Sequence, residues 1–392
     1  MDSQNRRSFL KKSGLVVLPA IIPFGSLLAN EKNIGAPYTT STYFVNFFRD
    51  GVVYSVADHL NELQKIHTLH PIKRDGYGYG GIVEELEKKF AELTGKEKAI
   101  YLPSGTMANQ LSISVLSGDN TKVYLQDTSH VYRDEADAAQ SLFNKRLMPL
   151  AKDKTYFTAD ELQKAIENLG EEEVFESGVG VVSIENPVRR TNGGIVPIEE
   201  IRKIRAYCQS KNIKMHLDGA RLYIASAWSG VSIKDYASNF DTVYISLYKY
   251  LGASGGAILC GPKAVIDKMP HLIKIHGGNM AENWLNAAMA LHRLEGIEIR
   301  LADAKKRAAE LFLEINKISG LKINEIIGGS NIYTLQLPKD ISGEKFCEKM
   351  YKDFKIGFNS PNENNQIDVL VNETILYQST SYFIDAIKKS LI

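Results

Sequence analysis

Residues 213–221 read IKMHLDGAR, a short apolar run that ends in an aspartate, a glycine and an arginine. A short apolar run bounded by turn residues is typical of a buried β-strand. Short apolar runs of the same kind occur at Ala99–Leu102, Lys122–Gln126, Gly178–Ile184, Thr242–Leu247 and Gly256–Cys260. Since helical patterns separate these runs, we predict an α/β fold, a mainly parallel sheet with helices on both faces.

The helices are predicted from apolar spacing and from one well-placed proline. Apolar residues recur at helical intervals over 82–94, and Pro197 stands at a favourable first position for a helix that runs to Ser210. Further helices are predicted at 56–66, 106–116, 131–142, 158–169, 281–295 and 299–318.

Composition and the pattern of predicted elements divide the chain into four parts. We expect a signal segment at 1–29, an N-terminal arm at 30–75, a large domain at 76–270 and a smaller α+β domain at 271–392. Ligands of open α/β sheets bind where the strands end, so a site is expected in the large domain.

The composition excludes several classes of protein. The 392 residues hold 47 Lys and Arg against 46 Asp and Glu, with 44% hydrophobic residues. The hydrophobic fraction is too high for a disordered chain. The near-equal numbers of basic and acidic residues lack the basic excess of a nucleic-acid binder. Cys208, Cys260 and Cys347 lie far apart with no CxxC pair. This spacing argues against a disulfide framework and against a zinc site, so no metal is predicted.

The first residues resemble an export signal. Asn5–Lys12 (NRRSFLKK) precedes an apolar stretch, Leu15–Ala29, that is too short to span a bilayer. The paired arginines followed by Phe-Leu-Lys resemble the bacterial twin-arginine signal, although Asn5 replaces its usual Ser or Thr. This resemblance predicts export to the periplasm by dedicated machinery. Without a signal, the protein would be cytoplasmic.

Three candidate chemical groups stand where predicted strands end. Ser104–Thr106 opens a helix after a strand, and free backbone N–H groups at a helix start can bind an anion. Asp218 follows an apolar strand, where a carboxylate needs a cationic partner or a shared proton. Lys249 lies between a buried strand and the turn at Gly252, and a partly desolvated lysine can act as a nucleophile. Each feature alone is ordinary, but together they match what pyridoxal phosphate requires.

Several segments resemble the threonine aldolase and β-eliminating lyase group of fold-type-I pyridoxal-phosphate enzymes, in the aspartate aminotransferase-like superfamily. The most specific are PSGTMANQ (103–110) and HLDGAR (216–221). The others are Val83–Gly95, Ile184–Asn186, Gly193–Pro197, Lys249–Gly252 and Gly277–Met280. The resemblance implies a mainly parallel seven-stranded sheet and a smaller C-terminal domain.

The resemblance implies cofactor-binding roles for five residues. Lys249 would attach pyridoxal phosphate covalently and would be catalytic. Asp218 would pair with the pyridine nitrogen. The phosphate would be held by Ser104, Gly105 and Thr106.

Three further residues receive roles from the resemblance. His130 would stack on the cofactor ring and, directly or through a water, would act as the catalytic base. Arg221 would lie near the cofactor or the substrate carboxylate. Asp50 matches the family's N-terminal active-site segment only thinly. On residue type alone, a lone histidine is more often structural, and an arginine that starts a helix is more often a surface ion pair.

The departures from the family pattern concentrate on the substrate side. Pro187-Val188 stands where aldolases have Thr-His, so a second active-site histidine is missing. Tyr250 replaces the glycine after the lysine, and Ala281 replaces an arginine. Aldolases also hold the substrate carboxylate with a C-terminal arginine, whereas no arginine follows Arg307. The sequence therefore predicts an intact cofactor site beside an altered substrate site.

By resemblance, the expected reaction is cleavage of the Cα–Cβ bond of a β-hydroxy amino acid to glycine and an aldehyde. The alternatives are β-elimination or another reaction at Cα of an amino acid, and a pseudoenzyme that binds cofactor without turnover. A homodimer or homotetramer is expected because such sites are built across a subunit interface. A small amino acid is the expected partner, and no nucleic acid is.

Overall fold

The computed structural model describes residues 44–175 and 177–391. The predicted signal segment lies outside these residues, as does the first part of the predicted arm. Within the two described ranges, no helix combines the length and the apolarity that a membrane crossing requires.

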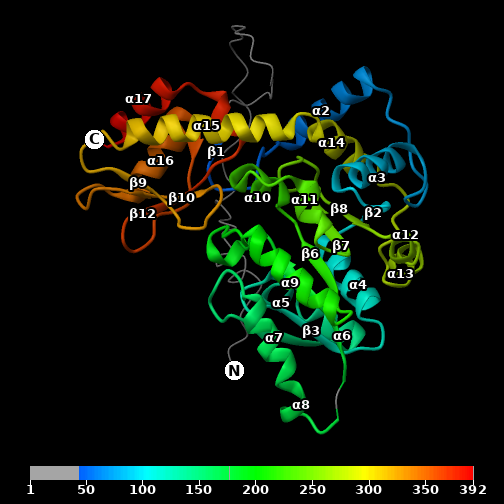
Figure 1. The fold of residues 1–392 in the computed structure, drawn as a ribbon. Coiled ribbons are helices and arrows are strands. Elements are labelled where there is room, and N and C mark those ends of the chain that lie inside the picture. The colour runs from blue at the N-terminus through cyan, green and yellow to red at the C-terminus, as the bar shows by residue number, and fades with distance from the viewer. Residues whose placement is uncertain (1–43, 176, 392) are drawn as a thin grey trace, which may run out of the picture. The chain divides into compact units, whose positions relative to one another are not determined.

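A seven-stranded sheet forms the centre, with the strand order β2-β8-β7-β6-β5-β3-β4 (Figure 1). The strands are β2 (Lys98–Leu102), β3 (Lys122–Gln126), β4 (Arg146–Leu150), β5 (Val179–Glu185), β6 (Lys214–Asp218), β7 (Thr242–Ser246) and β8 (Ala257–Gly261). Only β8 runs antiparallel to its neighbours, β2 and β7. The predicted α/β fold with a mainly parallel sheet is confirmed, and β4 is the one strand of this sheet that was not predicted.

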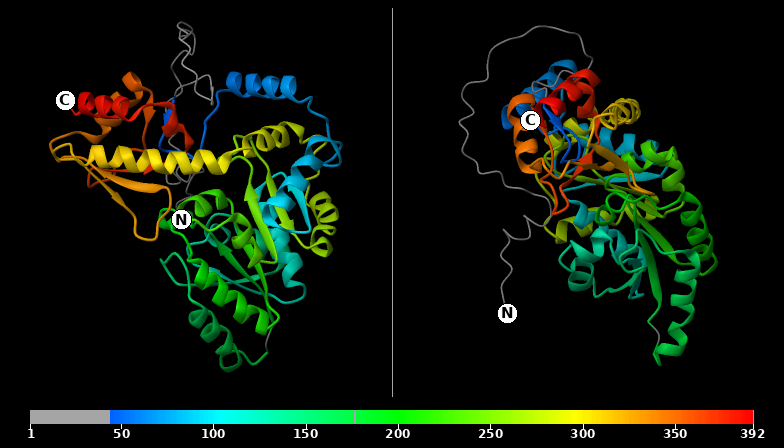
Figure 2. Two further views of the ribbon diagram at one scale, coloured as in Figure 1. Left: turned by 45° about the horizontal axis from the view of Figure 1, so that its top comes forward. Right: turned by 90° about the vertical axis from the view of Figure 1, so that its left-hand side faces the viewer.

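Alternation along the strands supplies both faces of the sheet with apolar side chains. In β7, Val243 and Ile245 belong to the cluster formed with α3 (Gly81–Thr94) and α9 (Ile198–Ser210). Tyr244, between them, packs with α4 (Gly105–Ser117) instead. Successive side chains of a strand point to opposite faces, so α4 covers one face while α3 and α9 cover the other (Figures 1 and 2).

The helix predicted at 131–142 is two short helices, α5 (His130–Arg133) and α6 (Ala138–Phe143). The break is at Ala136 and Asp137, which both have positive φ, an uncommon conformation for residues other than glycine. It turns the side chain of Glu135 inward, where it is 6% exposed.

The other helices need fewer corrections. The helix predicted at 158–169 is α7 (Ala159–Glu167) followed by α8 (Leu169–Glu172). The helices α2, α14 and α15 appear as expected, at Val56–Leu69, Trp284–Leu294 and Ile297–Ile315. Four helices between the predicted ones at 197–210 and 281–295 were not predicted: α10 (Leu222–Ser229), α11 (Ile233–Ser238), α12 (Lys263–Ile266) and α13 (Met269–Ile275).

The C-terminal part has its own three-stranded antiparallel sheet, in the order β12-β10-β9. Its elements are β9 (Lys322–Glu325), β10 (Ile332–Gln336), α16 (Gly343–Phe354), β11 (Ile356–Gly357), β12 (Gln366–Leu370), η2 (Glu373–Tyr377) and α17 (Thr380–Ser390). These elements share a hydrophobic cluster with α15, the long helix that lies beside them (Figure 2). The boundary predicted at residue 271 stays a prediction.

The segment before α2 joins the C-terminal part to the central sheet. Strand β1 (Val45–Asn46) pairs in parallel with β11, and the backbone N–H of Asn46 donates to Thr374 Oγ1 at 2.9 Å. The chain then crosses to the loop after β7, where the N–H of Tyr250 donates to the carbonyl of Asp50 at 3.4 Å. Gly51 is required at this crossing. Its φ is +77°, and a Cβ there would lie 2.9 Å from the Cα of Tyr250.

Candidate active site

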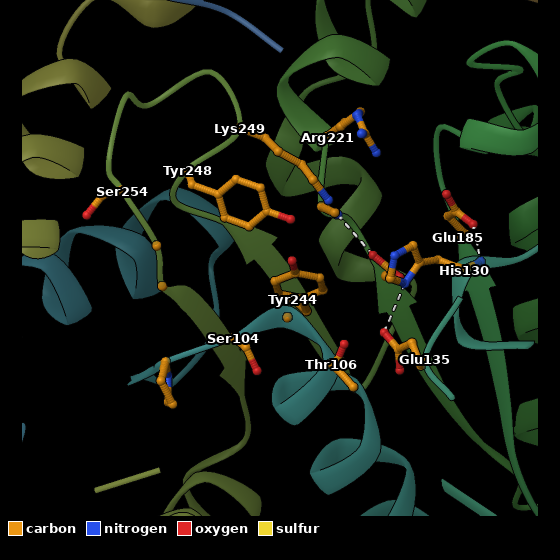
Figure 3. Close-up of a pocket in the computed structure, with 16 residues that line it drawn as sticks. Ser104, Thr106, His130, Glu135, Glu185, Arg221, Tyr244, Tyr248, Lys249 and Ser254 are labelled. Atoms are coloured by element: carbon orange, nitrogen blue, oxygen red, sulfur yellow. Dashed lines mark hydrogen bonds and ion pairs between the residues drawn. The ribbon is translucent and has the colours of Figure 1, made fainter. Parts of the chain in front are cut away.

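A cavity of about 240 Å³ opens where the strands of the central sheet end. The structure brings all seven predicted site residues to this cavity: Ser104, Gly105, Thr106, His130, Asp218, Arg221 and Lys249. Figure 3 shows Ser104 and Thr106 at the start of α4, with His130, Glu135 and Glu185 grouped on a separate wall.

One end of the cavity is the start of α4. Ser104 caps this helix of 13 residues, and its Oγ accepts a hydrogen bond from the N–H of Met107 at 3.3 Å. A Cβ at Gly105 would lie 2.0 Å from the hydroxyl of Tyr244, so this position needs glycine. The first N–H groups of a helix lack partners within the helix and favour negative charge, which suits a phosphate.

The floor of the cavity is a hydrogen-bonded network beneath Asp218, which is 2% exposed at the end of β6. Asn109 of α4 donates to Asp218 Oδ2 at 3.0 Å and to Glu135 Oε1 at 2.8 Å. Both N–H groups of the Asn109 amide are therefore used, and its Oδ1 faces His216 Nε2 at 2.9 Å. His216 must then donate from Nε2, which fixes its tautomer.

The second nitrogen of His216 completes this network. Its Nδ1 lies 3.1 Å from Ser112 Oγ and 2.9 Å from Thr242 Oγ1. Burial lowers the pKa of His216 to about 4, so the ring is neutral near pH 7. We call Asn109, Ser112, His216, Asp218 and Thr242 the floor network. All five are buried, and each finds a polar partner.

A histidine and two carboxylic acids form the wall beside the floor network. His130 Nδ1 lies 3.1 Å from Glu135 Oε1, and the backbone N–H of His130 donates to Glu185 Oε2 at 2.7 Å. Burial alone would lower the pKa of His130, but the hydrogen bond to Glu135 and the charge of Asp218 outweigh it and raise that pKa. Burial, reinforced by the charge of Asp218, raises the pKa of Glu185 to about 7.

Glu135 and Glu185 were not predicted as site residues. Glu135 follows His130 by five positions, so a continuous helix would not place the two side chains together. The break between α5 and α6 brings them into contact. Burial also raises the pKa of Glu135.

Lys249 lies at the opposite side of the cavity from these acids, in the loop after β7 (Figure 3). It is 7% exposed, and its Nζ lies 5.1 Å from the centre of the Tyr248 ring. Within the described part of the chain, no carboxylate forms an ion pair with it. A buried amine without an acidic partner is well suited to covalent bonding with a carbonyl.

Arg221 is the only arginine among the residues that line the cavity. Its Nε and Nη2 donate to Asp50 Oδ1 and Oδ2, each at 2.8 Å. The structure therefore brings Asp50 to the site, as a bidentate partner of Arg221. Val188, which stands where the resemblance places a second active-site histidine, is completely buried.

Two kinds of group could bind here. His130, Glu135 and Asp218 offer ligand atoms within 4.8 Å of one another, but Asn109 already donates to both carboxylates. The residues fit pyridoxal phosphate better. A helix start shaped by Gly105, a buried acid and a buried amine stand on separate walls of one cavity, as its phosphate, ring nitrogen and aldehyde require.

The profile of the beta-eliminating lyase family matches residues 70–336. The low-specificity L-threonine aldolase of Candida albicans is 35% identical over 212 residues, which cover 54% of this chain and 56% of that protein. The alanine racemase TOXG of Cochliobolus carbonum is 32% identical over 210 residues, covering 53% of each chain. This chain thus spans little more than half the length of these two relatives.

A solved structure shares the fold over most of its length. It is a putative L-allo-threonine aldolase from Listeria monocytogenes, with a TM-score of 0.73 and 24% identity. The match covers 88% of this chain and 95% of that one.

Proposed function

The chain belongs to the beta-eliminating lyase family, and we propose from this premise that it cleaves the Cα–Cβ bond of a β-hydroxy amino acid to glycine and an aldehyde. Members of this family and their structural neighbours use pyridoxal phosphate, so this chain is a pyridoxal-phosphate-dependent lyase. The substrate, the bond broken and the residue roles below are the proposal.

The floor network and the walls would hold the cofactor. Lys249 would bond to it covalently, Asp218 would keep its ring nitrogen protonated, and the start of α4 would bind its phosphate. Bound pyridoxal phosphate supplies an electron sink for negative charge that develops at Cα. Asn109 holds Asp218 in one orientation for this task.

The observation that carries the proposal is the His130–Glu135 pair in this cavity. Cleavage of Cα–Cβ requires a base that takes the proton of the β-hydroxyl. Glu135 orients the ring through Nδ1 and stabilises its charged form, while Nε2 has no hydrogen-bond partner among the described residues. His130 can therefore accept a proton at Nε2, directly or through one water.

A second candidate is a different reaction at Cα, either racemisation or β-elimination. Neither reaction needs a base at a β-hydroxyl, and Val188 stands where the family's second histidine is expected. The relative named alanine racemase points in the same direction. A pseudoenzyme that binds cofactor without turnover is the third candidate, because the substrate side carries the departures.

One assay separates these candidates. Holoenzyme is incubated with L-threonine, L-allo-threonine, L-serine and L-alanine, and the products are measured. Equal amounts of glycine and an aldehyde are expected, and His130→Asn should lose about 10²-fold or more of that rate. Keto acid with ammonia would establish β-elimination, and exchange of the Cα hydrogen without cleavage would establish racemisation. The absence of any product would establish a pseudoenzyme.

We propose further that the protein is a homodimer or homotetramer and that it is exported. The oligomer rests on the resemblance, and its mass in solution tests it. Export rests on the twin-arginine-like segment, and tracking the full chain in a bacterial host tests it.

A further inference from the structure

Glu185 stands at the end of β5, where both of its carboxyl oxygens accept hydrogen bonds from backbone N–H groups. Oε2 accepts from His130 at 2.7 Å, and Oε1 accepts from Arg189 at 2.9 Å. Figure 3 shows the first of these contacts at the edge of the cavity, which Glu185 lines. The two donors belong to the α5 segment (127–135) and to the β5 loop (186–194), so one buried side chain joins two parts of the chain.

The backbone of Glu185 is itself held by the strands on either side. Gln126, the last residue of β3, accepts from the N–H of Glu185 through Oε1 and donates to its carbonyl through Nε2, both at 2.9 Å. On the other side, Glu185 is in register with Asp218 of β6. Strands in the core of a fold are its most stable parts, so this carboxyl group is a fixed point to which neighbouring loops can be attached.

The short helix that carries His130 depends on such an outside attachment. Helix α5 has four residues, too few to be stable without tertiary contacts. Ser129 precedes it at the position where a serine often accepts a hydrogen bond from the helix, but its buried Oγ has no partner within the described residues. Glu185 instead supplies an acceptor for the first N–H group of the helix, from 55 positions further along the chain.

The β5 loop is held by the same carboxyl group, through the N–H of Arg189. The next residue, Arg190, forms an ion pair with Asp134 of the α5 segment, with Nε 3.0 Å from Oδ2. The α5 segment and the β5 loop are thus joined twice, by the buried Glu185 and by this more exposed ion pair. The loop also carries Val188, so the base and the main departure from the family pattern are held by one residue.

The side chain of His130 is held separately from its backbone. Glu135 Oε1 lies 3.1 Å from Nδ1, whereas Glu185 accepts from the backbone N–H. A histidine that is held at its backbone and at one ring nitrogen directs its other nitrogen, Nε2, to one place. This placement matters because a displacement of about 1 Å at a reacting group can cost on the order of 10²-fold in rate.

We propose that Glu185 is a positioning residue for His130: its carboxyl group ties the α5 segment to the β5 loop, so that the imidazole meets the substrate at a fixed place. This inference rests on the proposed function, in which His130 is the base. Glu185 acts through His130 and takes no proton from the substrate. A carboxyl group suits this task because it has two acceptor oxygens in either protonation state, whereas a carboxamide has one oxygen and an NH₂ group.

Glu185→Gln and Glu185→Asp test the proposal in the holoenzyme. Glutamine turns an NH₂ group towards one of the two N–H donors, and aspartate keeps the acid but is one methylene shorter. For aldehyde release, kcat should fall about tenfold in both variants with KM nearly unchanged, because a misplaced base weakens only the transition state. In a His130→Asn background, either change should lower the remaining rate by less than about twofold, since the positioned group is gone.

An NMR titration of the His130 ring gives a readout that needs no substrate. Although burial lowers the pKa of His130, its hydrogen bond to Glu135 and the charge of Asp218 raise it overall. In the full-length protein without cofactor, both variants should lower this pKa, because the ring moves away from Glu135. Glu185→Asp keeps the charge, so a decrease in both variants comes from placement. The signal is assigned by its loss in His130→Asn.

Glu87→Gln is the matched control. Glu87 also accepts from a backbone N–H, that of Tyr101 at 2.8 Å, and burial raises its pKa to about 7, but it does not line the cavity. This variant should leave kcat and the His130 titration unchanged.

An unchanged His130 titration in both Glu185 variants would overturn the proposal. So would equal losses of rate with and without His130, because that is the effect of a merely structural role. If wild type releases no aldehyde, the proposed reaction fails, but the titration still decides whether Glu185 positions His130.

Discussion

The floor of the cavity and its rim are built in different ways. The floor network comes from α4, β6 and β7, three elements of the central sheet and its covering helix. The rim, which we define as Asp50, Arg221, Tyr250 and Asn331, comes from four segments that lie far apart in the sequence. The floor network reaches the cavity through Asp218, and the rim reaches it through Arg221.

This difference indicates how the two tasks can vary independently. Each polar group of the floor has a specific partner, so a change there leaves buried groups unsatisfied and costs stability as well as chemistry. The rim depends on where the N-terminal segment meets the loop after β7. Changes in that segment can alter substrate binding while the cofactor site stays intact.

The largest expected effect comes from Lys249→Ala, which removes the cofactor's covalent partner. Turnover should fall by about 10³-fold or more, because a nucleophile is lost outright. The cofactor's visible absorbance band should shift to that of the non-covalent form. An unchanged spectrum would refute the assignment. Lys274→Ala, which removes a lysine whose Nζ lies 5.9 Å from the ring of Tyr77, is the control.

The second-largest effect is expected when the floor network is disrupted. Asn109→Leu keeps the size but leaves acceptors on Asp218 and Glu135 without their donor. We expect a loss of about 2–3 kcal/mol in unfolding free energy and weaker cofactor binding. Denaturant unfolding measures the loss of stability, and cofactor titration measures the loss of affinity. Asn239→Leu, at an asparagine that donates to Asp235 on α11, should cost less than half as much. Equal costs in the two variants would contradict a special role for the floor.

A smaller effect is expected when only the rim is disturbed. At Gly51→Ala the new Cβ would meet the backbone of Tyr250, so the Asp50 segment must shift. Glycine binding should weaken about tenfold, with cofactor affinity unchanged. Gly118→Ala also has positive φ but meets open space, so it carries the conformational strain of about 1 kcal/mol without the shift. A loss of cofactor affinity in Gly51→Ala would show that floor and rim are not separable.

The smallest effect is a pH dependence of stability that arises from Glu185, on the wall beside the floor network. The pKa of Glu185 is raised by burial from 4.5 to about 7, so the cofactor-free folded protein binds more protons than the unfolded chain between these values. Its stability should therefore fall as pH rises through this window, by at most about 1.4 kcal/mol per pH unit. Unfolding measured at pH 5, 6 and 7 tests this. Glu185→Gln should flatten the slope, and an equal slope would contradict the assignment.

The sequence predicted most of the fold because six strands of the sheet are buried apolar runs. Strand β4, one of the two edge strands of the sheet, was not predicted because none of its residues is fully buried, whereas three of the five residues of β2, at the other edge, are. Its residues Arg146–Leu150 are exposed or half-buried and include Pro149, which edge strands tolerate. Without a buried apolar run, the sequence pattern of β4 resembles that of a loop.

The sequence also predicted the cofactor side of the site better than the substrate side. Asp218 and Lys249 are marked by their places at strand ends, which local pattern reveals. Glu135 depended on a helix break, and the partners of Arg221 depended on contacts between distant segments. Asn109 looked like one polar residue in a helix. Only its position beneath Asp218 explains it.

The pairing of β1 with β11 has a consequence for the order in which the protein folds during synthesis. The hydrogen bond from Asn46 to Thr374 joins residues 328 positions apart, whereas the strands of the central sheet all lie between residues 98 and 261. Contacts at long sequence separation tend to form late, because closing a long loop costs conformational entropy before the contact is gained. During synthesis, the central sheet can therefore assemble before Thr374 has left the ribosome. We expect a nascent stage that binds cofactor but has not yet gained the ability to select an amino acid.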